Sequence, residues 1–380
     1  MKIAISATNP CHLYDLAKAL HAQHALGAYF SGYPRWKLSP PADFPLRAHS
    51  ARTLVTYGAL RLPAALRPAP HRLFRWQDAG FDRAVGQQLA AEDGGTIHAM
   101  PGQALETFRR AQSLGIGAVL NHASGPVRAQ LALVREEYDR AGVAFDASHG
   151  FDAAYFARED AEYALAGRHC VASSIVRTQL VSAGIPAERI WVVPYGADPE
   201  RFSPPSDNDP RELRRVVYAG QLTLRKGLRI ALAALEEVRR SVPVTFDLYG
   251  PANRDVASLV QEMQRHEWIH LHGAVDQRAL AEVFRRGTLL VLPSWEEAFG
   301  LVVVQALNCG LPCIVSDRVG AADLIVHRRN GSIFPAGDTQ ALAAEIAWWL
   351  EHPATYRAER IDWHAPAQRL LELSAAWRNE

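Results

Sequence analysis

The chain has 380 residues, of which 48% are hydrophobic and 21% charged, and this balance excludes a disordered protein. The length favours two domains over one. A formal net charge of +1 gives no overall field that would attract nucleic acid or a membrane. The four cysteines are too scattered for a disulfide framework. Cys309 and Cys313 have no second pair that would complete a zinc site, so we expect no bound metal.

An apolar stretch at 1–8 indicates a strand at the amino terminus. It is too short for the apolar core of a secretory signal and lacks a cleavage pattern. No run in the chain approaches the ~18 apolar residues needed to cross a bilayer. We therefore expect a cytoplasmic protein.

Short apolar runs alternate with helix-period stretches through the first half of the chain. The pattern predicts strands at 2–8, 97–100, 118–122, 170–173 and 190–195, and helices at 13–26, 103–114 and 126–141. A proline-rich polar stretch follows at 203–210. Because proline can neither pair within a sheet nor continue a helix, this stretch is the best linker in the chain.

The alternation restarts more clearly after the linker. Strands are predicted at 216–219, 244–248, 269–271, 289–292 and 313–315, with helices between them, the clearest at 228–238. The stretch 341–377 is predicted to be helical, with four tryptophans as packing anchors: Trp348, Trp349, Trp363 and Trp377.

Alternation of this kind is typical of an α/β protein with doubly wound parallel sheets. Two such sheets predict two facing Rossmann-like domains with a cleft between them. We expect the first domain at 1–203 and the second at 211–360. The C-terminal helix, about 360–380, is expected to pack back on the first domain.

The segment 33–83 does not follow this rhythm. It begins at Tyr33 and carries nine arginines or lysines against three aspartates, with six further aromatic residues interleaved: Trp36, Phe44, Tyr57, Phe74, Trp76 and Phe81. One interpretation is an irregular insertion whose aromatic side chains fill a small core of their own. The other is a basic, aromatic surface that docks an anionic lipid or a lipid-diphosphate acceptor at a membrane face. No recognised nucleic-acid-binding module accompanies the charge, which argues against nucleic acid.

The strongest functional signal lies at 293–312, PSWEEAFGLVVVQALNCGLP. An apolar strand ends at Leu292, a polar loop follows, and Phe299-Gly300 opens a helix that runs to about Asn308. A strand end that feeds a helix amino terminus is where open α/β sheets bind ligands. The free N–H groups and the helix dipole there favour a phosphate, and Gly300 lets the backbone approach it closely.

The second signal lies at 218–228, YAGQLTLRKGL. A strand ends near Ala219, the loop carries Arg225 and Lys226, and a helix starts at Gly227. Two adjacent cations at the carboxyl end of a strand suit a diphosphate that leaves with growing negative charge. A basic pair in a loop is usually a solvated surface. Its place at the mouth of a parallel sheet, facing the first loop, favours the functional interpretation.

These two segments resemble the retaining glycosyltransferase family 4 (group 1 glycosyltransferases), which has the GT-B fold. The family pattern Pro-Ser, Glu-x-Phe-Gly, a second Glu and Gly-x-Pro falls on Pro293, Ser294, Glu297, Phe299, Gly300, Gln305, Gly310 and Pro312. The pattern Gly-x-Leu then Lys-Gly matches Gly220, Leu222, Lys226 and Gly227. The resemblance covers about 165–340, and the amino-terminal third matches only in rhythm.

The resemblance implies a nucleoside-diphosphate sugar in the cleft, held mostly by the second domain, with the first domain on the acceptor side. Arg225 and Lys226 would neutralise the leaving diphosphate, aided by backbone N–H groups of Gly300 and Leu301. Glu297 would hold hydroxyls of the donor sugar and stabilise positive charge at the anomeric carbon. Protein cations would replace a metal, so no cofactor is expected, and the configuration would be retained. Further substrate-binding residues are expected at Gly220, Gln221, Val275, Phe299 and Gln305.

Two histidines at the ends of predicted strands are further candidates. In the family a histidine near the position of His122 borders the donor sugar, so His122 joins the candidate catalytic residues and His98 the substrate-binding ones. A histidine at a strand end is more often part of hydrogen-bonded structure. Asp207-Asn-Asp209 matches the Asp-x-Asp metal motif of the other glycosyltransferase architecture, but its place in the linker indicates a solvated segment.

The sequence departs from the family pattern at three places. The glutamate that holds the ribose hydroxyls is replaced by the neutral amide of Gln305. The arginine after the first glycine of the basic loop is Gln221, and Arg225 can substitute for it. The stretch 9–12, Asn-Pro-Cys-His, replaces a glycine-rich turn after the first strand.

The sequence thus predicts a retaining, metal-independent glycosyltransferase that moves a sugar to a glycan or lipid-linked acceptor in polysaccharide or glycolipid synthesis. Docking through 33–83 would place it at the inner face of the cell membrane. One alternative is a sugar-nucleotide epimerase or phosphorylase on the same fold. Neither of these enzymes explains why the Glu297-x-Phe-Gly loop and the Lys226 loop occur together. The other is a glycosyltransferase-like binding or scaffold protein, which Gln221 and Gln305 favour and the retained Lys226 and Glu297 oppose.

Overall fold

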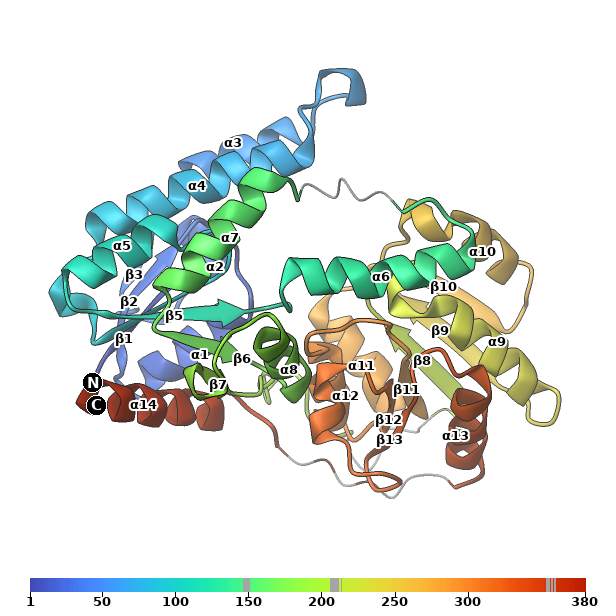
Figure 1. Cartoon of the computed structure of the whole chain (residues 1–380). Coiled ribbons are helices and arrows are strands. Elements are labelled where there is room, and N and C mark those ends of the chain that lie inside the picture. Colours follow the sequence, from blue (N-terminus) through green and yellow to red (C-terminus); the bar gives the residue numbers. More distant parts are fainter. Residues whose placement is uncertain (146–150, 206–211, 213, 353–355, 357, 359) are drawn as a thin grey trace.

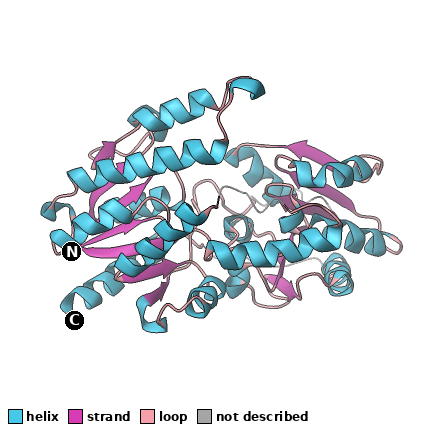
Figure 2. Cartoon of the chain, turned by 45° about the horizontal axis from the view of Figure 1, so that its top comes forward, coloured by secondary structure: helices cyan, strands magenta, loops and turns pink. Residues whose placement is uncertain are grey.

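The structure is a computed structural model that describes residues 1–145, 151–205, 212, 214–352, 356, 358 and 360–380. These residues form two parallel sheets, one of seven strands and one of six. Helices flank each sheet, and the result is two lobes side by side (Figures 1 and 2). The predicted fold class, two doubly wound α/β lobes, is confirmed.

The N-lobe contains the sheet β3-β2-β1-β4-β5-β6-β7. Successive residues of β1 face opposite cores: Ile3 and Ile5 belong to one cluster and Ala4 to another, as expected of a parallel strand covered on both faces. The strands are β1 (Ile3–Ala7), β2 (Leu26–Ser31), β3 (Leu46–Ala48), β4 (Thr96–Ala99), β5 (Gly117–His122), β6 (Arg168–Val171) and β7 (Ile190–Val192). The helices are α1 (His12–Ala22), α2 (Arg35–Leu38), α3 (Ala51–Ala59), α4 (Pro70–Gln88), α5 (Leu105–Ser113), α7 (Ala153–Leu165) and α8 (Ser174–Ser182). A further helix, α6 (Val127–Ala141), lies between β5 and α7 in the sequence but packs on the second lobe.

The C-lobe contains the sheet β10-β9-β8-β11-β12-β13. The strand order reverses between β8 and β11, so this lobe has its topological switch point there, where ligands bind beyond the carboxyl ends of the strands. The strands are β8 (Arg215–Ala219), β9 (Thr245–Tyr249), β10 (Ile269–Gly273), β11 (Leu289–Leu292), β12 (Cys313–Ser316) and β13 (Gly331–Phe334). The helices are the 3-10 turn η4 (Leu224–Lys226), α9 (Leu228–Arg239), α10 (Ala257–Met263), α11 (Gln277–Arg286), α12 (Leu301–Asn308) and α13 (Thr339–Glu351).

The last helix, α14 (His364–Asn379), lies on the N-lobe. Trp363, Ala367 and Leu370 join the core cluster that also contains Leu13 and Leu16 of α1. Both chain termini therefore lie at the same lobe (Figures 1 and 2). The chain passes between the lobes near Ala197 and again near Ile361, and these two crossings touch: the N–H of Ala197 donates to the carbonyl of Ile361 at 3.0 Å.

Two predicted helices have the wrong extent. The helix predicted at 13–26 ends at Ala22, because His24 takes a left-handed φ of 55° and the N–H of Ala25 bonds back to Leu20. The stretch after it is β2, which was not predicted. The helix predicted at 341–377 is two helices, since α13 ends at Glu351 and His352, before a proline, leaves the helical region with φ −118° and ψ 76°.

The segment 33–83 is not an irregular insertion with a core of its own. It supplies α2, α3, α4 and the strand β3, which pairs with β2. Phe44 and Phe81 pack into the two cores of the N-lobe sheet. Trp36 and Trp76, by contrast, are exposed. Most of the predicted linker, including Asp207 and Asp209, lies outside the described residues.

Candidate active site

Three loops meet at the switch point of the C-lobe. They follow β8, β11 and β12, and backbone hydrogen bonds join them. The N–H of Trp295 donates to the carbonyl of Arg225 at 2.9 Å, and the N–H of Glu297 donates to the carbonyl of Arg318 at 3.1 Å. Gly227 brings the first two loops together, because a Cβ there would lie 1.9 Å from the carbonyl oxygen of Pro293. The loops therefore form one rigid platform at the carboxyl edge of the sheet.

Lys226 and Glu297 form an ion pair at the centre of this platform. Lys226 is only 9% exposed. Burial lowers its pKa from 10.5 to about 7; Arg225 acts in the same direction, and the carboxylate of Glu296 opposes them. Contact with Glu297 favours the ammonium form. A ligand can separate this pair. The buried ammonium can then bind a phosphate, and the carboxylate can accept hydrogen bonds from hydroxyls.

Arg225 is held differently from its neighbour. Its Nη1 donates to the Oε2 of Glu296 and to the carbonyl of the same residue, both at 2.8 Å. Glu296 is 2% exposed, and its Oε2 also accepts from the side chain of Gln130 on α6 at 3.0 Å. The guanidinium of Arg225 is therefore committed to a protein carboxylate, and Lys226 is the cation that stands next to Glu297.

A pocket of about 370 Å³ lies beside the platform, over the carboxyl ends of β8, β9 and β10 and the first turns of α11 and α12. Five predicted substrate-binding residues line it: Gly220, Gln221, Val275, Leu301 and Gln305. Its exposed wall is mostly apolar, formed by residues such as Val302 and Leu280, with a few polar groups. A concave, largely apolar pocket with a small number of polar side chains suits a nucleoside.

The two glutamines that depart from the family pattern have protein partners in this pocket. The amide of Gln305 donates to the side-chain oxygen of Gln277 at 3.1 Å. The amide of Gln221 donates to the side-chain oxygen of Asn253 at 2.8 Å. Both carry donor and acceptor atoms at the pocket wall without adding charge.

Phe299 and Gly300 lie next to the pocket and shape the loop. Gly300 takes a left-handed φ of 88° just before α12, so that the helix amino terminus opens toward the platform. Phe299 packs its ring against Tyr195 of the first crossing, with ring centroids 4.9 Å apart. Tyr195 also stacks on His12 of α1, at 4.2 Å. The loop that carries Glu297 is thus tied to the N-lobe by aromatic packing.

His98 and His122 do not line the donor pocket. Both are buried; burial lowers the pKa of His98 to about 3 and holds the pKa of His122 well below its usual value. The ring of His98 bonds to Asn121 at 2.6 Å, and the ring of His122 bonds to His169 at 2.9 Å. Both imidazoles are neutral parts of the N-lobe sheet in this structure.

The sequence did not point to Gln130, Glu296 or Tyr195. Glu296 stands beside a predicted residue, and the double glutamate of the loop was the available signal. Gln130 and Tyr195 gave none, because their roles depend on contacts between distant parts of the chain.

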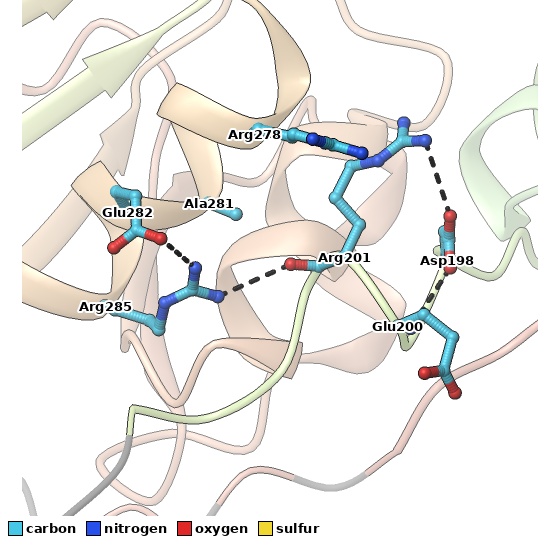
Figure 3. Close-up of a pocket in the computed structure, with 7 residues that line it drawn as sticks. All are labelled: Asp198, Glu200, Arg201, Arg278, Ala281, Glu282 and Arg285. Atoms are coloured by element: carbon cyan, nitrogen blue, oxygen red, sulfur yellow. Dashed lines mark hydrogen bonds and ion pairs between the residues drawn. The ribbon is translucent and has the colours of Figure 1, made fainter.

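A second pocket, of about 430 Å³, lies on the other side of α11. Figure 3 shows Arg278, Glu282 and Arg285 of this helix on one side of the pocket and Asp198, Glu200 and Arg201 of the first crossing on the other. Asp198 pairs with Arg201 at 3.6 Å, and Glu282 pairs with Arg285. Three acidic and three basic side chains balance in charge, and none is a predicted donor residue.

The sequence profile of the family described as glycosyl transferases group 1 matches residues 214–352, which hold the platform and the donor pocket. The C-lobe belongs to the group 1 glycosyl transferases. This confirms the family predicted from the two loops.

Similar proteins point the same way. The amylovoran biosynthesis glycosyltransferase AmsK of Erwinia amylovora is 27% identical over 181 residues, 45% of this chain and 44% of that protein. A D-inositol 3-phosphate glycosyltransferase of Xylanimonas cellulosilytica is 29% identical over 219 residues, 50% of this chain and 52% of that protein. The chain thus matches about half the length of each of these relatives.

The whole chain matches a solved structure of Anabaena Alr3699/HepE in complex with UDP, with a TM-score of 0.66 and 17% identity over 99% of this chain and all of that one. The fold of the chain is GT-B. Within the described residues, no helix has the length and apolar character needed to span a membrane. In the same residues, no three histidine, cysteine or acidic side chains are grouped as metal ligands.

Proposed function

We propose that this chain transfers a sugar from a nucleoside-diphosphate sugar to a glycan or lipid-linked acceptor, with retention of configuration and without a metal ion. The proposal is carried by the ion pair between the buried Lys226 and the partly buried Glu297 at the switch point of the C-lobe. The pair stands beside a pocket of a size and polarity that suit a nucleoside.

The donor is proposed to lie with its nucleoside in the pocket. The base would lie near Val275, with the backbone of Gly220 and Gln221 beside it, and Gln305 would bond to the ribose hydroxyls. The diphosphate would extend toward Lys226 and the amino terminus of α12 at Gly300 and Leu301. UDP is the first nucleotide to test, because the HepE structure of the same fold holds it.

Lys226 exchanges partners in this scheme. When the diphosphate binds, the ammonium of Lys226 turns from Glu297 to the phosphate oxygens and stabilises the charge that develops as the diphosphate leaves. Glu297 is then free to accept hydrogen bonds from the donor sugar and to stabilise positive charge at the anomeric carbon. Arg225, held by Glu296, adds to the positive potential without touching the leaving group. With cations placed in this way, the leaving group needs no divalent metal. We assign no step to His98 or His122.

The test is the thermal stability of the purified chain with UDP, GDP, ADP, CDP and dTDP, each with and without EDTA. A ligand at 100 times its dissociation constant stabilises the native state by ~2.7 kcal/mol. We expect one diphosphate to raise the midpoint equally with and without EDTA, and Lys226→Ala to lose that response. No response to any nucleotide would refute the donor site and favour a scaffold role. Turnover of the matching sugar nucleotide, followed by NMR of the anomeric proton, tests retention.

The segment 33–83 supports a second part of the proposal, a peripheral contact with an anionic membrane that carries the acceptor. Its exposed apolar side chains are Trp36, Leu54, Val55, Tyr57, Leu62, Leu66 and Trp76. The same segment exposes cations, among them Arg35, Lys37, Arg61, Arg67 and Arg72. Apolar side chains that enter the interface, together with cations that meet anionic headgroups, give reversible binding.

Vesicle binding tests this part. We expect the chain to sediment with vesicles that contain phosphatidylglycerol and not with vesicles of phosphatidylcholine alone. Trp36→Ser combined with Leu66→Ser should abolish sedimentation, whereas Val326→Ser, which removes an exposed apolar side chain from the C-lobe, should not. Equal binding by all variants would contradict the assignment of this surface.

A further inference from the structure

Helix α6 follows a strand of the N-lobe but packs on the C-lobe. It lies between β5 and α7 in the sequence, both of which belong to the N-lobe. Figure 1 shows it reaching across the C-lobe toward α9 and α10. Its Val134 and Tyr138 are buried in the same core cluster as β8, β11 and α12. Most of the helix is therefore a structural part of the lobe that holds the candidate donor site.

The first turn of α6 is attached to the other lobe. The N–H of Val127 donates to the carboxylate of Glu159 on α7 at 3.5 Å. Arg128 makes two hydrogen bonds to Asp160 on the same helix, at 2.8 and 3.0 Å. Both lobes thus hold this one helix, the N-lobe at its first turn and the C-lobe along the rest.

Tyr138 connects α6 to the turn that carries the catalytic cation. Its hydroxyl donates to the Oδ2 of Asp255 at 2.6 Å. The same oxygen accepts the backbone N–H of Leu224, the first residue of η4, at 3.0 Å. Asp255 is thereby fixed between α6 and η4. Because Lys226 ends η4, the hydroxyl of Tyr138 restrains the backbone two residues from the ammonium.

Gln130 makes a second connection to the platform. Its amide donates to the Oε2 of Glu296, the same oxygen that Arg225 contacts. A buried carboxylate that faces one guanidinium and one amide is fixed in direction by both. Glu296 precedes Glu297 in the chain, so α6 also restrains the loop on the sugar side of the site.

We propose that α6 is a positioning element of the donor site: Tyr138 and Gln130, supplied by the N-terminal half of the chain, hold η4 and the Glu297 loop in the arrangement that binds the diphosphate. Neither residue touches the donor; Tyr138 acts through Asp255 and Gln130 through Glu296. Because the N-lobe holds the first turn of α6, the placement of Lys226 depends on the position of the N-lobe. This inference rests on the proposed function for its ligand, but the restraint on η4 exists without one.

Tyr138→Phe is the main variant, since it removes one hydroxyl and keeps the buried ring. The matched control is Tyr14→Phe, which removes a hydroxyl that donates to the carbonyl of Leu38 within the N-lobe. Hydrogen–deuterium exchange of the peptide 221–228 is measured without nucleotide. We expect about threefold to tenfold faster exchange in Tyr138→Phe and no change in Tyr14→Phe. Gln130→Leu gives an independent variant, with the effect expected in the peptide 294–300.

Affinity for the same five nucleoside diphosphates is then measured by calorimetry. We expect the dissociation constant to be about threefold to tenfold higher in Tyr138→Phe and Gln130→Leu than in the wild type, and unchanged in Tyr14→Phe. Unchanged exchange in both α6 variants would overturn the proposal. Faster exchange with unaltered nucleotide affinity would overturn its link to donor binding. If wild type binds no nucleotide but the exchange changes as expected, the proposed function fails and the restraint on η4 stands.

Discussion

Replacing Gly227 by alanine tests the close contact between two loops of the candidate active site. Gly227 has a left-handed φ of 71°, and an added Cβ would lie 1.9 Å from the carbonyl oxygen of Pro293. Left-handed backbone costs a residue with a Cβ roughly 1–2 kcal/mol. Relief of the overlap requires the backbone of one loop to move, which adds ~1–3 kcal/mol, as for other overpacked sites. The expected loss of stability is therefore about 2–5 kcal/mol.

Gly273 supplies the control, because its φ is 69° and an added Cβ would meet nothing within 4 Å. Gly273→Ala has the same cost of a left-handed backbone and the same effect on the unfolded chain as Gly227→Ala. The difference in stability between the two variants therefore isolates the contact with Pro293. In thermal unfolding, the midpoint of Gly227→Ala should fall at least ~2–4 °C further than that of Gly273→Ala. Gly227→Ala should also lose stabilisation by nucleotide, because Lys226 is the preceding residue. Equal midpoints for the two variants would refute the close approach of the loops.

Three further predictions follow from the charges and amides of the site. Gln305→Glu should tighten donor binding by roughly 1 kcal/mol, or leave it unchanged, because a carboxylate adds a charge-assisted bond to the ribose; a large loss in calorimetry would mean that the pocket depends on the amide that donates to Gln277. Nucleotide affinity should fall as the pH rises above about 7, because the buried Lys226, with its lowered pKa, then gives up its proton. Lys226→Arg should bind nucleotide equally at pH ~6.5 and ~8.5, since a guanidinium stays charged. Parallel pH profiles of affinity for the wild type and Lys226→Arg would contradict the role of Lys226 as the cation that binds the phosphate. Burial raises the pKa of Glu137 from 4.5 to about 7, so between these pH values the native state holds the proton more tightly than the unfolded chain, and the stability of the wild type falls as the pH rises. Across that pH range, the thermal unfolding midpoint of Glu137→Gln should therefore rise relative to that of the wild type. A difference between the two midpoints that stays constant with pH would count against this.

The parts of the fold that could be predicted from sequence are those with a strong local signal. β8, β11 and β12 are buried on both faces and stand out as apolar runs. β3 has only three residues, and β13 starts with a glycine; each is an edge strand formed by pairing with one neighbour. Such strands are set by tertiary contacts, which local composition does not record.

The candidate site divides in the same way. Parallel strands place their carboxyl ends at one edge, so the gathering of Gly220, Val275 and Gln305 in one pocket follows from topology. The partner of Arg225 could not be predicted, because its pairing with Glu296 depends on the path of two loops. For the same reason, the sequence placed α6 as a helix but gave no sign that it lies on the C-lobe.

The two crossings between the lobes have a mechanical consequence. The N–H of Ala197 donates a hydrogen bond to the carbonyl of Ile361, so the two segments that join the lobes are linked side by side at this point. A movement of one lobe relative to the other therefore has to carry both segments together. The rings of Tyr195 on the first crossing and Trp363 at the end of the second add another contact between the segments, with their centroids 5.6 Å apart. The two crossings thus form one hinge between the lobes rather than two independent linkers.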